Sequence, residues 1–267
     1  MRTALAAGHP ARLVSEQIAA LGLGHLVMVH SSLRALGPMA GGVDTVLAAL
    51  RQAMGRDGTL TVPTFTTENS DTSDPYRDRV RGLDEGAVAA FRAAMPPFDP
   101  EHSRAPLMGV LAETVRQTPG AARSEHPQTS FAALGPAADK IVTGHHRDCH
   151  LGEDSPLARL YELDAEVLLL GVGFDVLTAF HLAEYRVPVP PRRTYRCVVR
   201  AENGERRWWE YEDAVLDDSD FARIGADFER VGGDVRTVPV GSGTARLLRL
   251  RDAVDFATEW LPAHRGY

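Results

Sequence analysis

The chain has 267 residues, 44% of them hydrophobic and 24% charged, which is enough for one large core, and we expect a single domain over residues 1–267. Its 29 lysines and arginines against 36 aspartates and glutamates give a net charge of -7, which argues against a nucleic-acid partner because binding phosphates requires a concentrated basic surface. No apolar run approaches a membrane span, so we expect no membrane partner. The short Ala/Leu stretch at 1–8 is interrupted at 9–12 before a secretory signal develops. With only Cys149 and Cys197, no disulfide framework is implied, and the cytoplasm is the expected compartment.

The first third of the sequence alternates helical and strand patterns. Residues 26–29 form an apolar run that predicts a buried strand, and residues 58–65 alternate threonine with apolar side chains. The predicted elements are helices at 11–21, 41–54 and 85–95, strands at 26–29 and 58–65, and a polar loop at 66–81.

The remainder predicts further helices, one strong strand and a hairpin. The run 165–172 is the strongest buried strand, and Asn203-Gly204 is typical of a hairpin turn between strands at 195–200 and 207–211. Helices are predicted at 109–117, 136–143, 156–163, 220–231 and 245–261. Strands alternate with helices early in the chain and pair antiparallel late, which indicates a mixed sheet covered by helices on both faces.

His181 and Glu184 follow the strongest strand and are three residues apart. On a helix this spacing places both side chains on one face, where the carboxylate can fix the imidazole tautomer and stabilise its protonated form. A surface or capping role is the alternative for such a pair. The position beyond a strand end, at an exit containing Gly171 and Gly173, favours a general base.

The loop 31–42 lies between a buried strand and a helix start, and its small residues expose backbone N–H groups. It predicts a site for a cofactor diphosphate. Because G-x-x-x-x-G-K-[ST] and G-x-G-x-x-G are both missing, nucleoside triphosphates and dinucleotides are poorly supported. Residues 34–39 approach the acetyl-CoA loop of the common N-acetyltransferase superfamily, but Met39 occupies the last position, so that fold is not expected.

Other reactive side chains give weaker signals. His146 and His150 have the i, i+4 spacing of metal ligands, but flanking glycines favour a polar loop, and we expect no metal. Gly241-Ser242-Gly243 lacks the G-x-S-x-G nucleophile elbow, and neither cysteine has the setting of a nucleophile, so covalent catalysis is disfavoured.

A series of ordered motifs resembles the aminoglycoside 3-N-acetyltransferases, the antibiotic N-acetyltransferase family. The motifs lie at 29–33, 41–42, 62–65, 108–109, 119–127, 130–135, 155–157, 169–173, 178 and 181–184. The resemblance implies a three-layer α/β/α domain that transfers acetyl from acetyl-CoA to the 3-amino group of a 2-deoxystreptamine ring, which gives resistance to aminoglycoside antibiotics.

For such an enzyme we expect His181 to be the general base, Glu184 to support it and Thr178 to stabilise the oxyanion. The residues expected at the coenzyme A site are Ser31, Ser32, Leu33, Arg34, Met39, Gly41, Gly42, Thr64, Ser103 and Met108. The residues expected to hold the polycationic aminoglycoside are Phe65, Asp71, His126, Glu212 and Asp213.

Two other functions remain open on sequence grounds. One is a related N-acyltransferase that acts on a different small amine metabolite, and the other is a non-catalytic protein that recognises amino sugars through the same acidic cleft. The sequence assigns neither the accepted aminoglycosides nor an oligomeric state.

Overall fold

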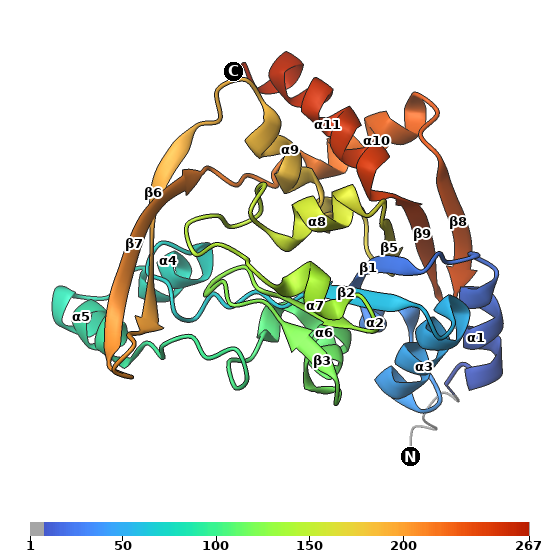
Figure 1. Ribbon diagram of the computed structural model, residues 1–267, viewed down its shortest axis with the longest axis horizontal. Helices are drawn as coiled ribbons and strands as arrows, with labels where there is room; N and C mark the ends of the chain where they lie inside the picture. The colour runs from blue at the N-terminus through green and yellow to red at the C-terminus, as the bar shows by residue number, and fades with distance from the viewer. Residues whose placement is uncertain (1–7, 267) are drawn as a thin grey trace.

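A seven-stranded mixed sheet forms the centre of the structure, a computed structural model that describes residues 8–266 (Figure 1). The predicted lack of a signal at 1–8 therefore falls almost entirely outside the described residues. The strands are β1 (Leu26–Ser31), β2 (Thr59–Pro63), β3 (Ala121–Arg123), β4 (Phe131–Leu134), β5 (Glu166–Leu170), β8 (Val235–Val240) and β9 (Gly243–Arg249). Their order is β3-β4-β2-β1-β5-β9-β8. β1 pairs in parallel with β2 and β5, and the outer pairings are antiparallel.

Helices cover both faces of this sheet. One face packs against α1 (Ala11–Ala19), α2 (Leu33–Leu36), α3 (Gly42–Met54) and α6 (Gly109–Gln117). The other packs against α7 (Ala138–Val142), α8 (Pro156–Glu162), α9 (Phe180–Arg186), α10 (Phe221–Arg230) and α11 (Leu250–Arg265). The short 3-10 turns η1 (Pro106–Met108) and η2 (Phe174–Val176) precede α6 and α9. No helix within residues 8–266 is long and apolar enough to cross a membrane.

The central strands supply both hydrophobic cores. In β1, Val27 and Val29 join the core beneath α1 and α3, whereas Met28 joins the core beneath α8 and α11. This alternation follows from the two-residue period of a strand, and it explains why the run 26–29 is continuously apolar. The three-layer α/β/α fold with a mixed sheet is therefore confirmed.

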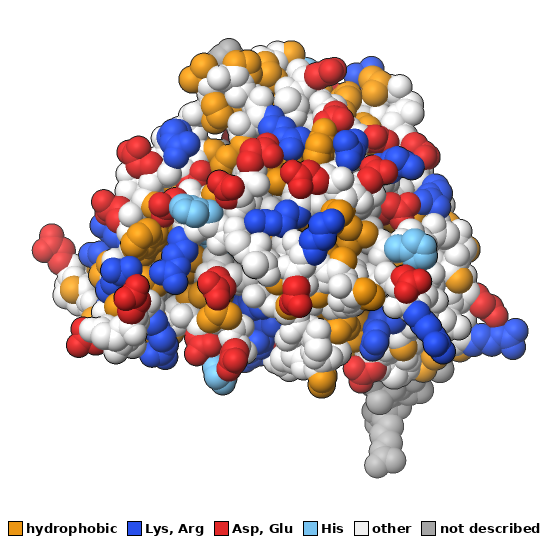
Figure 2. Space-filling model, viewed as in Figure 1, with side chains coloured by type: hydrophobic (Ala, Val, Ile, Leu, Met, Phe, Trp, Pro, Cys, Tyr) orange, Lys and Arg blue, Asp and Glu red, His pale blue; other side chains and the backbone are white. Residues whose placement is uncertain are grey.

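A separate two-stranded sheet projects beside the main one. Its strands are β6 (Arg192–Arg200) and β7 (Arg206–Ala214), which confirm the predicted hairpin but extend beyond the predicted bounds. Gly204 has φ 81°, the left-handed conformation that glycine adopts without strain. Helices α4 (Asp74–Val80) and α5 (Glu85–Ala94) lie beside this hairpin (Figure 1). Figure 2 shows acidic and basic side chains interspersed over the face of the molecule that is seen in Figure 1.

The structure corrects two predicted elements and adds four strands. The predicted loop 66–81 contains α4, which Ser73 caps by accepting a hydrogen bond from the Tyr76 amide. The predicted helix 245–261 begins only at Leu250, because residues 243–249 form β9 and pair with β5 and β8. Besides β9, the strands β3, β4 and β8 were not predicted from the sequence. These segments are strands because they pair with their neighbours in the sheet, and local spacing of apolar residues does not reveal that pairing.

Candidate active site

A cavity of about 590 Å³ opens at the carboxyl ends of the parallel strands β1, β2 and β5. Ligands of sheet-and-helix proteins commonly bind at this edge. Residues from β1 and the loop after it, from the start of α6 and from the segment after β5 surround it. The lining residues are Val29, His30, Ser31, Ser32, Leu33, Arg34, Pro63, Phe65, Leu107, Met108, Gly109, Val110, Val172, Asp175, Val176, Thr178, His181, Asp218 and Phe221.

The turn after β5 brings the segment that carries Thr178 and His181 over the cavity. Gly171 has φ 72°, and a Cβ atom at this position would lie 2.7 Å from the Ser32 carbonyl oxygen. The close approach of two strand exits therefore requires glycine here. The carbonyl of Thr178 then accepts a hydrogen bond from the His181 amide at 3.0 Å, which begins α9.

His181 and Glu184 form a close pair on α9. The Nδ1 atom of His181 lies 2.7 Å from Oε2 of Glu184. The Glu184 side chain is 1% exposed, and that of His181 is 13% exposed. Because a carboxylate only accepts hydrogen bonds, Nδ1 carries the proton and the neutral ring keeps its lone pair on Nε2. The ring packs against Phe221, with centroids 4.7 Å apart. This arrangement fixes the orientation of the imidazole ring.

Arg265, in the last turn of α11, completes the support of Glu184. Its guanidinium donates to Oε1 of Glu184 and also bonds to Asp220 and to the Asp217 carbonyl. The Asp217 amide donates to the same Glu184 oxygen at 3.0 Å. These partners compensate the cost of burying a carboxylate. Sequence reasoning missed Arg265, because a single arginine in a terminal helix carries no signal of a partner 81 residues away.

The structure brings part of the expected coenzyme A site to the cavity. Ser31, Ser32, Leu33, Arg34 and Met108 all line it. Ser32 also caps the short helix α2 by accepting from the Ala35 amide at 3.4 Å.

Five other residues of that expected set lie away from this cavity. Met39 pairs with His9, and Gly41 and Gly42 form the start of α3. Thr64 is buried and donates to the Ser130 carbonyl at 3.0 Å, and Ser103 borders a different cavity.

The acids expected to hold a polycation also lie away from this cavity. Asp71 is paired with Arg92 and Arg196 at 2.9 and 2.7 Å, and its side chain is 2% exposed. Asp213 is buried within the protein, and Glu212 is an exposed residue of β7 that does not line the cavity.

The acids that do line the cavity are Asp175 and Asp218. Asp218 belongs to an acidic run that is visible in the sequence, whereas Asp175 carries no such signal. Phe65, which was expected at the substrate site, lines the cavity as well.

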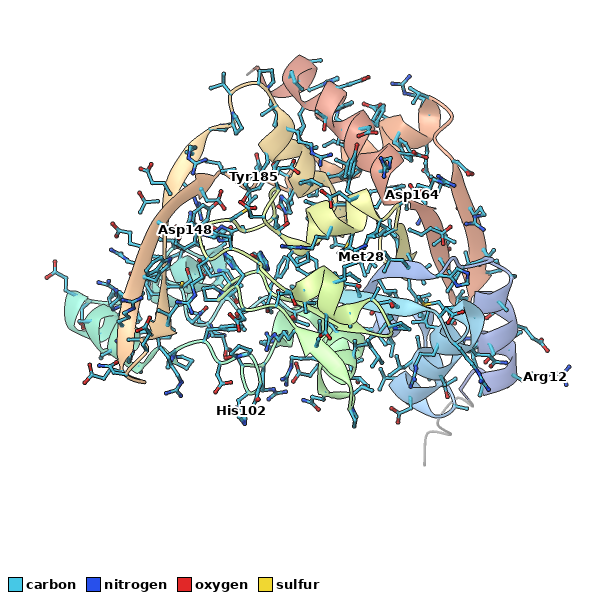
Figure 3. All side chains as sticks on the ribbon, viewed as in Figure 1. Arg12, Met28, His102, Asp148, Asp164 and Tyr185 are labelled. Carbon is cyan, nitrogen blue, oxygen red and sulfur yellow. The ribbon has the colours of Figure 1, made fainter. Side chains whose placement is uncertain are left out.

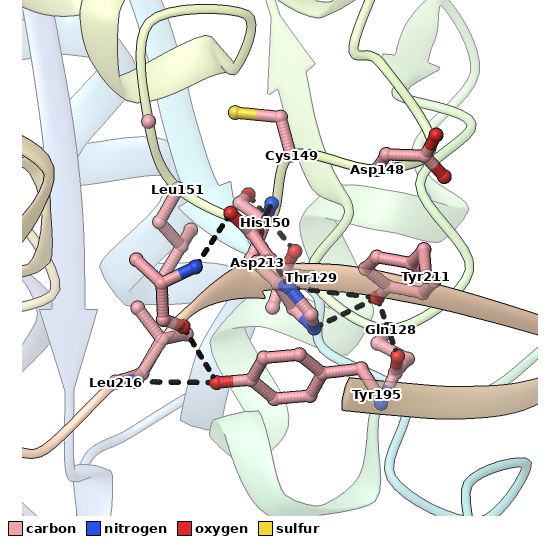
Figure 4. A network of polar contacts seen from close by, with 12 residues as sticks. Gln128, Thr129, Asp148, Cys149, His150, Leu151, Tyr195, Tyr211, Asp213 and Leu216 are labelled. Carbon is pink, nitrogen blue, oxygen red and sulfur yellow. Dashed lines mark hydrogen bonds and ion pairs between the residues drawn. The ribbon is translucent and has the colours of Figure 1, made fainter. Parts of the chain in front are cut away.

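His126 lies outside the cavity, in a buried cluster with His145 and His150. Figure 4 shows His150 in its network of polar contacts with Tyr211 and Asp213. Asp213 accepts hydrogen bonds from the His150 ring at 3.0 Å and from the Tyr185 hydroxyl at 2.6 Å. Burial lowers the pKa of His145 to about 3, and it lowers the pKa values of His126 and His150 as well. The cluster therefore consists of neutral rings that join the hairpin β6–β7 to the loops around residues 126 and 150.

Within residues 8–266, no three or more histidine, cysteine, aspartate or glutamate side chains form a group that could hold a metal ion. Both cysteines are unpaired thiols, and burial raises their pKa values to about 11 for Cys149 and about 12 for Cys197. Neither is therefore prepared to act as a thiolate.

Comparison with known proteins gives the family. Residues 28–262 match the family model described as aminoglycoside 3-N-acetyltransferase. The chain belongs to this family. It is 37% identical over 270 residues to aminoglycoside N(3)-acetyltransferase VII of Streptomyces paromomycinus, with 95% of this chain and 91% of that one covered.

Solved structures of family members share this fold. The YokD protein of Bacillus subtilis superposes with a TM-score of 0.89 at 34% identity, covering 97% of this chain and 95% of its own. The acetyltransferase AAC-IIIb, solved as a binary complex with CoASH, superposes with a TM-score of 0.82 at 31% identity, covering 96% and 97%. These similarities agree with the family predicted from the motifs.

Proposed function

We propose that this enzyme transfers the acetyl group of acetyl-CoA to the 3-amino group of the 2-deoxystreptamine ring of aminoglycosides, and thereby gives resistance to them. The observation that carries the proposal is the contact between His181 and Glu184 at a cavity large enough for small ligands. The names of the relatives, and the CoASH complex of AAC-IIIb, support the reaction and its acetyl donor.

His181 acts as the general base in this mechanism. Nε2 removes a proton from the amine as the amine nitrogen attacks the thioester carbon, and Glu184 stabilises the imidazolium that forms. The tetrahedral intermediate then collapses, the carbon–sulfur bond breaks and coenzyme A leaves with the electron pair. Because a thiol has a pKa of about 8.5, the thiolate needs little acid assistance. Thr178 lies in the same cavity and donates its hydroxyl proton toward the oxyanion.

The loop Ser31 to Arg34 and the start of α6 hold coenzyme A. The loop follows a buried strand and carries small side chains, and the exposed Arg34 guanidinium binds a phosphate of the cofactor. Leu107 and Val110 are exposed apolar residues at 62% and 52%, and they border the same cavity. They provide an apolar contact for the pantetheine arm.

Asp175 and Asp218 are the acidic residues of the site for the aminoglycoside. Both line the cavity that contains His181, whereas Asp71 is paired with two arginines and Asp213 is buried and accepts hydrogen bonds from His150 and Tyr185. The acids would hold neighbouring ammonium groups of the same molecule, so that the uncharged 3-amine lies beside His181 for attack, and the carboxylates favour polycations over neutral sugars.

The release of free thiol from acetyl-CoA, measured over a panel of amines, tests this function. The proposal predicts rapid release with aminoglycosides that carry a free 3-amino group and little release with analogues acetylated at that position. Release only with unrelated amines would favour another acylation reaction, and binding without release would favour a non-catalytic role.

A further inference from the structure

His30 is an imidazole in the active-site cavity to which the mechanism above gives no task. It lies at the end of β1, lines the cavity with His181 and is 8% exposed. Its Nε2 atom is buried and has no hydrogen-bond partner among residues 8–266. A buried polar atom without a partner is costly, so the fold holds this ring here at the expense of stability.

The ring stays neutral in the folded protein. Burial, with a further contribution from the nearby His181, lowers the pKa of His30 to about 4. A neutral imidazole always carries one N–H donor and one acceptor nitrogen. His30 therefore provides a donor without adding a second positive charge beside the general base.

Two backbone donors beside the cavity are already committed. The Ser32 amide donates to the Leu170 carbonyl, and the Gly171 amide donates to the Thr244 carbonyl, each at 2.9 Å. The Thr178 hydroxyl remains as one side-chain donor that faces the cavity. A tetrahedral intermediate commonly receives more than one hydrogen bond, which leaves a place for His30.

We propose that His30 is a catalytic residue whose ring N–H donates a hydrogen bond to the thioester carbonyl oxygen as that oxygen becomes negative. This inference rests on the proposed acetyl transfer. As the nitrogen–carbon bond forms, the carbonyl electron pair moves to the oxygen and the His30 hydrogen bond strengthens. On collapse the pair returns, the carbon–sulfur bond breaks, and His30 keeps its proton throughout.

Neutrality is what makes this role compatible with His181. When His181 becomes an imidazolium, a charged His30 would repel it and weaken the base, whereas a neutral ring does not. The charged side chains that line the cavity with the pair are Arg34, Asp175 and Asp218, and Glu184, supported by Arg265, lies behind His181. The donation by His30 therefore lowers the barrier without competing for the proton that His181 takes.

Substitutions of His30 test the proposal through the separation of kcat from KM. His30→Leu should lower kcat by about 10²-fold while KM for acetyl-CoA stays within about threefold. An amide provides an N–H donor near Nδ1 in His30→Asn and near Nε2 in His30→Gln, so one of these two should recover at least about tenfold of the loss. Met28→Leu is the matched control, because Met28 is buried on the same face of β1 two residues earlier and does not line the cavity.

Two kinetic results would overturn this role while acetyl transfer itself stands. One is a His30→Leu enzyme with kcat within about threefold of wild type, and the other is a pair of amide variants no better than leucine. If the wild-type enzyme releases no thiol with any aminoglycoside, the proposed function fails first, and the two failures are thus distinguishable.

A measurement on the wild-type enzyme covers the case in which the leucine variant does not fold. In protein with ¹⁵N-labelled histidine, the His30 ring N–H signal should move downfield with S-acetonyl-coenzyme A, whose ketone replaces the thioester. Coenzyme A, which lacks the carbonyl, should leave it nearly unchanged. An equal response to both compounds, or none to either, contradicts the hydrogen bond.

Discussion

The buried neutral histidines should make the protein sensitive to mild acid. In the folded state the pKa of His145 is about 3 and that of His30 is about 4, both lowered by burial, whereas an unfolded histidine titrates near 6.5. At a pH between the folded and the unfolded pKa values, the unfolded chain binds more protons than the folded protein. The free energy of unfolding therefore falls as the pH falls below about 6.5. The stabilising contribution is complete above that pH and is lost as the pH approaches the folded values.

The magnitude follows from proton linkage. Lowering the pH from about 7 to about 5 protonates an unfolded histidine almost fully and leaves either folded ring almost neutral, which costs about 2 kcal/mol for each. His30 and His145 together give about 4 kcal/mol, and the lowered pKa values of His126 and His150 act in the same direction. A typical domain has about 5–15 kcal/mol of stability, so most of the margin can be lost by pH 5.

Urea unfolding followed by tryptophan fluorescence at pH 7, 6 and 5 measures this loss. In His145→Gln the decrease between pH 7 and pH 5 should be smaller by about 2 kcal/mol, even if the variant is less stable at pH 7. His102→Gln is the control, because that side chain is 78% exposed at the edge of the molecule (Figure 3). A free energy of unfolding that stays constant to within about 1 kcal/mol from pH 7 to pH 5 would refute the reasoning.

Further variants test the active site. Glu184→Gln should lower kcat about 10- to 100-fold with little change in KM for acetyl-CoA. A KM for acetyl-CoA that rises by as large a factor as kcat falls would argue that Glu184 does not act by orienting His181. Arg265→Met should lower kcat by a similar factor and Arg265→Lys by less, as steady-state kinetics will show. Asp175→Asn and Asp218→Asn should each raise KM for aminoglycosides about tenfold, and added salt should act in the same direction. Asp71→Asn should leave that KM unchanged but lower the free energy of unfolding by about 1–3 kcal/mol, because two arginines lose their partner.

Local patterns predicted the centre of the fold well. β1, β5 and α3 are continuous apolar or periodic segments, and the Asn203-Gly204 turn marks the hairpin directly. β9 was read as helix because Leu247, Leu248 and Leu250 also fit helical spacing, and only its pairing with β5 makes it a strand. That pairing joins residues about 80 positions apart, which no local window contains.

The difference between local and long-range contacts also explains which site residues were predicted correctly. His181 and Glu184 are neighbours on one helix, so their spacing alone predicted the contact that the structure has. Asp71 and Asp213 resemble surface acids in the sequence, but their hydrogen-bond partners Arg196 and His150 lie 125 and 63 residues away. Arg265 and His30 were missed for the same reason: their significance depends on what the fold places beside them.

The transfer rate of His181→Ala tests the central claim most directly. Under saturating acetyl-CoA and aminoglycoside, thiol release should fall about 10²- to 10⁴-fold, because the base that takes the amine proton is gone. Calorimetry should show that coenzyme A binding persists, since the imidazole has no part in holding the cofactor. A variant that retains release within about threefold of wild type would contradict the assignment of His181 as the general base.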